Sequence, residues 1–245
     1  MKLAESAPKL KPEVGVHWRG HVFLFARKRA ATFNGSVGVR LLLIFLLLEG
    51  VIGPRLSLFR FLNVPLPPLW LRISTLLAFA LLLVRFAAGV NFSEVGLYRW
   101  REWSGTEKSY FVQLLIISNA IFLLIFWDRL RTIVSEPTVM RLMLTVMLPD
   151  LVWGFYQELV YRGILQTELV RRFGSVAGVL VANILFTFGP LHFYHFQRTA
   201  SPMPVFAGIF AIGLFFGTVF QKSGNLWIVA IAHGIGNFYI EGTGR

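Results

Sequence analysis

Long apolar stretches, separated by short polar or proline-containing segments, run along most of the chain. A helix needs about 20 apolar residues to cross the hydrocarbon core of a bilayer, and six or seven stretches approach that length. The pattern predicts an all-α fold, a polytopic helical membrane bundle of about 7–8 helices. The predicted spans are 37–53, 69–90, 110–127, 138–172, 175–196, 203–220 and 226–240.

Two of these stretches contain features that bear on the local structure. The stretch 138–172 is interpreted as one span followed by a second, less apolar helix, and we expect Pro149 and Asp150 to break it in the middle, with Asp150 as a helix cap. Glu49 lies within the first span, where we expect it to be either paired with an arginine or protonated.

The first 36 residues differ from the rest, because they contain no stretch long enough to span a membrane. They carry seven Lys or Arg against two Glu, with aromatic residues interspersed between His17 and Phe33. This composition predicts that residues 1–36 form a basic amphipathic arm on the membrane surface, which anionic lipid would bind. The remaining chain is expected to divide into amino-terminal transmembrane helices (37–136) and a carboxy-terminal core (137–245).

The composition supports an integral membrane protein. Hydrophobic residues make up 56% of the chain and charged residues only 15%, whereas soluble domains contain about 25% charged residues. The absence of cysteine excludes disulfides, thiolate metal sites and a cysteine nucleophile.

The net charge of +12 is distributed unevenly along the chain. If the spans alternate from a cytoplasmic amino terminus, 14 Lys and Arg lie inside and 8 outside, as the positive-inside rule requires. We therefore expect the amino terminus to lie in the cytoplasm. The compact chain and the absence of organelle signals favour a bacterial cytoplasmic membrane protein. Nucleic acid is not an expected partner, because the chain has no groove-reading or base-stacking motif.

Polar residues within the predicted spans are the candidate functional residues. Placing an ionisable side chain in a membrane costs several kcal/mol of free energy unless the side chain is paired. Taken singly, each cluster is explained by a structural ion pair, a buried histidine or hydrogen bonds between helices. Their occurrence together in the last 90 residues favours an acid–base site. The clusters are Gln157-Glu158 with Arg162, Phe188 to His192 with His195 beyond it, and His233 with Asn237.

In this order and spacing, the three clusters resemble the Glu-Glu-x-x-x-Arg, Phe-x-x-x-His and His-x-x-x-Asn motifs of the CAAX protease and bacteriocin-processing (CPBP, or Abi) family of intramembrane endopeptidases. The resemblance covers about residues 140–240 and implies that 137–245 is the catalytic core of a glutamic protease. It implies a general base at position 157, His192 and His233 orienting water or sharing its proton, Asn237 as oxyanion donor, and Arg162 paired with Glu158.

The chain departs from the family pattern at Gln157, because an amide does not accept a proton at useful pH. We interpret this as an inactivating substitution, introduced to preserve a protease or to trap substrate. The alternatives are a natural pseudoenzyme, or Glu158 serving as the base.

The expected substrate is a membrane-anchored or lipidated protein, cleaved in maturation, sorting or removal of its carboxy-terminal tail. No cofactor is expected, although two histidines and a carboxylate leave zinc as an alternative.

Two other functions remain open. One is a non-catalytic immunity or scaffold protein of the same fold; the other is a transporter with a proton relay, which no inverted repeat supports.

Overall fold

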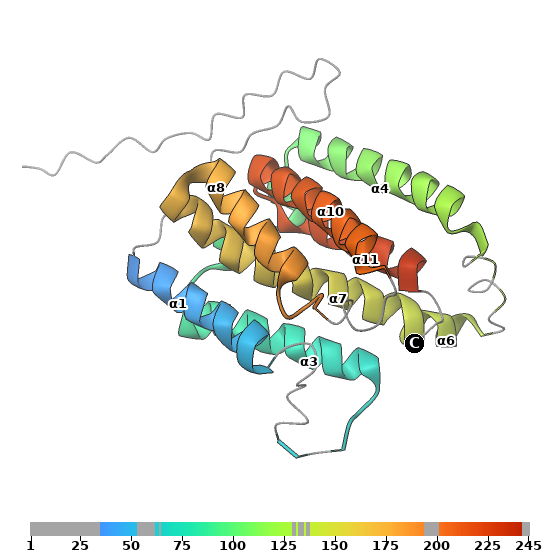
Figure 1. Cartoon of the computed structure of the whole chain (residues 1–245), viewed down its shortest axis with the longest axis horizontal. Helices are drawn as coiled ribbons and strands as arrows, with labels where there is room; N and C mark the ends of the chain where they lie inside the picture. Colours follow the sequence, from blue (N-terminus) through green and yellow to red (C-terminus); the bar gives the residue numbers. More distant parts are fainter. Residues whose placement is uncertain are drawn as a thin grey trace, which may run out of the picture.

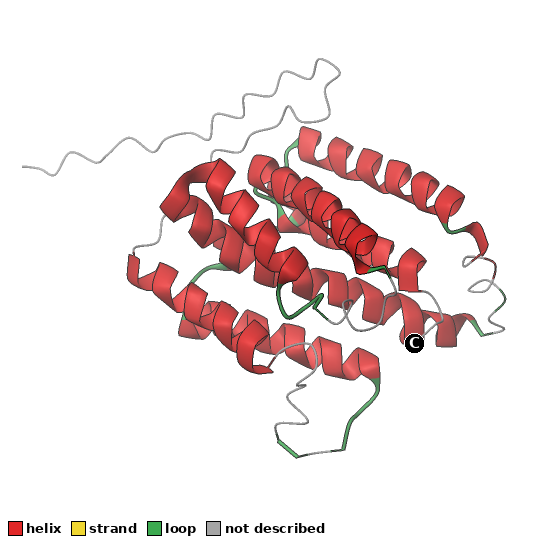
Figure 2. Ribbon diagram, in the orientation of Figure 1, coloured by secondary structure: helices red, strands yellow, loops and turns green. Residues whose placement is uncertain are grey.

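The structure is a computed structural model that describes residues 35–52, 62–63, 65–128, 131, 135, 138–193 and 201–241. Throughout these ranges the regular structure is helical, and no strand occurs (Figure 2). The predicted arm lies outside the described residues except for residues 35 and 36, and so does His195. The division into three domains stays a prediction.

The helices follow the apolar stretches closely, and several contain or adjoin π-helical or 3₁₀ segments. Their bounds are α1 (Gly35–Leu46), η1 (Leu47–Ile52), α3 (Leu69–Leu82), η2 (Leu83–Ala87), η3 (Phe92–Val95), η4 (Trp100–Glu102), α4 (Gly105–Ile125), α6 (Val139–Leu142), η5 (Met143–Met147), α7 (Leu148–Glu158), η6 (Leu159–Gln166), α8 (Thr167–Phe188), α10 (Pro202–Ser223) and α11 (Leu226–Glu241).

The long helix from α6 to η6 forms the centre of the bundle (Figure 1). In that view α1 and α3 lie on one side of it, and α8, α10 and α11 lie on the other. The helix α11 packs along α7, α10 packs along α8, and α4 lies at the outer edge against α11. This arrangement gives the central helix neighbours on two sides, so its polar residues are buried.

Five helical segments are long and apolar enough to cross a membrane: 35–52, 69–87, 105–125, 140–188 and 202–223. A shorter apolar helix, 226–240, completes the set among the described residues. The side chains that face outward include large apolar ones, such as Leu124 and Phe86, as expected for surfaces in contact with lipid. The prediction of an all-α membrane bundle is confirmed.

The predicted break at Pro149 is wrong, because the chain stays helical from Val139 to Phe173. Proline lacks the N–H that an α-helix uses, and its ring collides with the carbonyl one turn earlier. Immediately before Pro149 the helix widens into the π-helical turn η5, whose longer bonding interval relieves that collision. Asp150 is therefore buried within a continuing helix and does not cap one.

The backbone breaks instead at Gly174, which has a positive φ of 80° within α8. Residues other than glycine rarely adopt a positive φ, so the presence of glycine explains why the helix breaks at this position. Beyond it α8 ends at Phe188, earlier than the predicted 196, because Gly189 is extended and a residue before proline is disfavoured in a helix. The residues up to 193 form turns, so His192 lies just outside the helix.

Candidate active site

Two glycines bring α7 and α11 into backbone contact. A Cβ atom at Gly154 would lie 2.5 Å from the backbone nitrogen of Gly234, and one at Gly234 would lie 2.7 Å from the Cα of Leu151. No real side chain fits at such distances, so only glycine permits this close approach. The crossing places the end of α7, which carries Glu158, against the histidine beside Gly234.

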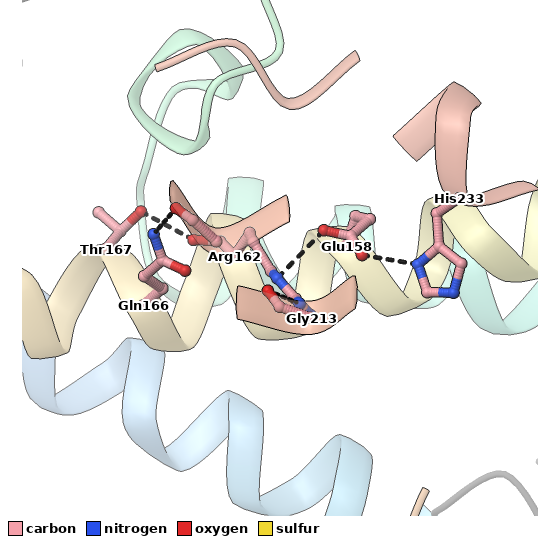
Figure 3. Close-up of polar contacts among 7 residues, drawn as sticks. Glu158, Arg162, Gln166, Thr167, Gly213 and His233 are labelled. Carbon is pink, nitrogen blue, oxygen red and sulfur yellow. Dashed lines mark hydrogen bonds and ion pairs between the residues drawn. The ribbon is translucent and has the colours of Figure 1, made fainter. Parts of the chain in front are cut away.

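Glu158 and His233 meet beside this crossing, and Arg162 completes the group (Figure 3). Glu158 is completely buried, with its Oε1 2.6 Å from Nδ1 of His233 and its Oε2 3.2 Å from Nε of Arg162. The Glu158–Arg162 contact is an ion pair without a well-aligned hydrogen bond, whereas the contact with His233 is a hydrogen bond. Both oxygens of Glu158 are therefore engaged by charged or chargeable partners.

Arg162 is held by α10 as well as by Glu158. Its Nη2 donates to the carbonyl oxygen of Gly213 over 2.8 Å, and its guanidinium lies 4.1 Å from the centre of the Phe186 ring. One turn along, Gln166 donates to the carbonyl of Gly217 over 2.9 Å. These backbone carbonyls are accessible because Gly213 and Gly217 leave room for the approach.

His192 lies in the turn after α8 and is nearly buried. Its Nδ1 is 2.7 Å from the carbonyl oxygen of Phe186. Because a carbonyl only accepts, Nδ1 must carry the hydrogen, and in the neutral ring Nε2 is then left as an acceptor. The turn therefore fixes the tautomer of His192 in which Nε2 can accept a hydrogen bond.

Phe186, which the sequence motif did not single out, lies at the centre of these groups. Its ring is edge-on to His192 with centroids 4.6 Å apart, and edge-on to His233 at 6.0 Å. The motif phenylalanine, Phe188, is 46% exposed and stacks on Phe206 instead. Two residues along a helix turn the side chain by about 200°, so these two phenylalanines face opposite sides, and the sequence offers no signal that distinguishes them.

Gln157 and Asn237 carry polar atoms that the fold itself does not use. The amide oxygen of Gln157 is buried and makes no hydrogen bond to any described residue, and the same holds for the amide nitrogen of Asn237. Such atoms usually find a partner, so these two remain available to a bound substrate or water.

The structure thus joins Glu158, Arg162 and His233 directly, and it links His192 to them through Phe186. Gln157 adjoins this group in the chain, and Asn237 lies one turn beyond His233 on α11. Within the described part of the chain, no group of three His, Cys, Asp or Glu side chains is arranged to hold a metal ion. The catalytic roles of these residues stay predictions.

Comparison with known proteins bears on the same segment. Residues 140–239 match the family model described as "Type II CAAX prenyl endopeptidase Rce1-like". No curated protein and no solved structure gives a significant match. The matched segment begins in α6, ends in α11 and contains all three motifs, so the resemblance drawn from those motifs is confirmed. Over residues 140–239, the chain is similar to the Rce1-like type II CAAX prenyl endopeptidases, a family of proteases.

Proposed function

We propose that the protein is built as an intramembrane endopeptidase that hydrolyses a peptide bond in a membrane-associated protein by means of a glutamate-activated water. We further propose that Gln157 leaves the present chain without its general base. The observation that carries this proposal is the contrast between neighbouring positions: Glu158 bonds His233 and forms an ion pair with Arg162, whereas the amide oxygen of Gln157 is buried and accepts a hydrogen bond from no described residue.

A carboxylate at position 157 would supply the missing step. It would take a proton from water while the hydroxide forms a bond to the substrate carbonyl carbon. The proton would then pass to the leaving nitrogen as the peptide bond breaks. His192 Nε2 would orient the water, and the amide N–H of Asn237, which bonds no described residue, would donate to the oxyanion. Gln157 has the shape of the acid but no basic site, so binding would survive and cleavage would stop.

Glu158 is better suited to positioning than to proton transfer. Its Oε1 holds Nδ1 of His233, and its Oε2 faces the guanidinium of Arg162. Proton transfer from water to this carboxylate would require one of those buried contacts to be given up, leaving a buried charge without its partner.

The substrate in this proposal is a membrane-anchored or lipidated protein, processed for maturation, sorting or removal of a carboxy-terminal tail. The description of the matched family, which names a CAAX prenyl endopeptidase, supports a lipidated carboxy-terminal peptide as the first substrate to test. Apolar outward faces on the helices are consistent with a substrate that arrives from the bilayer.

The test compares the chain with its Gln157→Glu variant, both reconstituted in lipid vesicles with a prenylated carboxy-terminal peptide and with an unlipidated control peptide. We expect cleavage by the variant and binding without cleavage by the chain itself. Gln166→Glu is the matched control, because Gln166 is a second buried glutamine on the same helix and donates to Gly217. Cleavage by the unchanged chain, together with an inert Gln157→Glu variant, would show that the assignment of the base is wrong.

The proposed mechanism uses no metal, and this is tested in the Gln157→Glu variant. We expect its activity to be unchanged by a strong chelator. Loss of activity on chelation that zinc restores would overturn the metal-free mechanism in favour of a zinc-bound water.

A second candidate function rests on the same glutamine. In a non-catalytic immunity or scaffold protein, the amide of Gln157 would bind a peptide group as donor and acceptor, and no base would be required. This function predicts that both the chain and Gln157→Glu bind substrate and that neither cleaves it.

A further inference from the structure

We infer that Glu49 of the first membrane span is a positioning residue for His192, the histidine of the motif Phe188 to His192. Glu49 acts through Tyr161, which lies beside the turn that holds His192. This inference rests on the proposed function, because it assigns a role in the same site. Glu49 lies in the π-helical segment η1 and is 3% exposed. A buried carboxyl group within a membrane span is costly unless its oxygens are satisfied, so its presence requires a reason.

The partners of Glu49 come from the helix that carries the first motif. The hydroxyl of Tyr161 donates to its Oε2 over 2.8 Å, and the hydroxyl of Tyr156 lies 3.3 Å from its Oε1. Among the described residues, Glu49 bonds these two phenols and no arginine, so of the two states expected from the sequence, paired with an arginine or protonated, the arginine pair is not found. Glu49 therefore ties the first span to the central helix at the level of Gln157 and Glu158.

The central helix has two polar faces at this level. Tyr156 at the end of α7 and Tyr161 in η6 both bond Glu49. Glu158 and Arg162, four apart, face α10 and α11 through Gly213 and His233. The same stretch thus faces Glu49 with one side and the candidate active site with the other.

Tyr161 also contacts the structure that holds His192. Its ring is edge-on to Phe186 at a centroid distance of 5.2 Å, and its hydroxyl lies 3.4 Å from the position that a Cβ of Gly189 would take. Phe186 supplies the carbonyl that binds Nδ1 of His192, and Gly189 begins the turn, its carbonyl accepting from the His192 N–H. Tyr161 therefore contacts the segment from 186 to 192 at Phe186, and its hydroxyl lies beside Gly189.

The physical consequence concerns the orientation of the His192 ring. With its hydroxyl bound to Glu49, Tyr161 has one ring position, and Phe186 and Gly189 pack against that position. Without the acceptor, the phenol must find another partner or remain unsatisfied, which costs free energy in a buried site. The ring then moves, and the turn with His192 moves with it. His233 has a separate anchor in Glu158 and is expected to stay in place.

The inference is tested first without catalysis, by nitrogen NMR of ¹⁵N-histidine-labelled protein in lipid nanodiscs, with His192→Gln used to assign the signal. Glu49→Leu and Tyr161→Phe should each shift or broaden the Nδ1 resonance of His192 and leave that of His233 unchanged. Glu49→Gln, which keeps an acceptor for Tyr161, should restore the His192 signal. Tyr156→Phe is the matched control, because it removes the other bond to Glu49 and should have the smaller effect.

The second test uses activity in the Gln157→Glu background. There Glu49→Leu should lower kcat by about tenfold or more and leave KM within about twofold, as expected for a group that orients the reacting residues. An inert Gln157→Glu variant would argue against the proposed function alone, because the NMR result stands independently. An unchanged His192 resonance in folded Glu49→Leu or folded Tyr161→Phe would overturn the inference.

Discussion

At the scale of single residues, the ion pair between Glu158 and Arg162 shows how charge is kept inside an apolar bundle. Glu158 is completely buried and Arg162 is 1% exposed. The guanidinium is shared among a carboxylate, the Gly213 carbonyl and the face of Phe186. The spacing of four along a helix predicts the pair from sequence, but the other two partners lie far away in the chain.

We expect Arg162→Met to destabilise the protein by about 3–5 kcal/mol, because the change leaves the carboxylate of Glu158 buried without its cation. The measurement is reversible unfolding in mild detergent, with Arg171→Met as the control, since Arg171 is a partly exposed arginine whose partner Glu168 also bonds Arg172. Equal losses in the two variants would contradict the special role of Arg162.

At the scale of elements, close helix approaches decide which residues meet. Gly154 and Gly234 let α7 and α11 touch, and Gly213 lets α10 approach α8 and η6. The sequence indicates small residues that allow packing. It does not indicate which of them lie at a contact, because this depends on the rotation of each helix about its axis.

Two glycines of α10 test which small residues lie at a contact between helices. A Cβ at Gly213 would overlap Oδ1 of Asn183 and lie 2.9 Å from the ring of Phe186, whereas one at Gly208 meets nothing within 4 Å. We expect Gly213→Ala to cost about 1–3 kcal/mol through overpacking, and Gly208→Ala to be neutral or slightly stabilising through its better helix propensity. The thermal midpoints of both variants in detergent provide the comparison. Similar midpoints would mean that α10 does not approach α8 as described.

At the scale of the whole molecule, segments far apart in the chain bring basic residues to one end of the bundle. Arg40 of α1 donates to the carbonyl of Ala87 at the end of η2. Glu168 lies against Gly38 of α1 and binds Arg171 and Arg172. Gln221, beside Lys222, donates to Ser175. From the positive-inside rule we expect this end to face the cytoplasm.

The absence of native cysteine makes this orientation testable with single cysteines at the two ends of α10. Lys222→Cys should react with a membrane-impermeant maleimide from the cytoplasmic side only, and Met203→Cys from the opposite side only. Both positions are exposed, so labelling in detergent confirms that each thiol is reactive. The reverse pattern in intact cells and inverted vesicles would mean that the amino terminus lies outside.

The all-α membrane bundle and the resemblance to the protease family both follow from the sequence alone, for a shared physical reason. The hydropathy of a span and motifs with a spacing of four are local properties of the sequence. Within the bilayer, each apolar stretch must form a helix, because only then are its backbone N–H and C=O groups hydrogen-bonded within the stretch. Contacts between distant segments were decided only by the tertiary structure. Phe186 rather than Phe188 packs against the histidines, Glu49 binds two tyrosines of another helix, and a π-turn carries the helix through Pro149. Each of these depends on how one helix is rotated and wound against its neighbours, which local pattern does not determine.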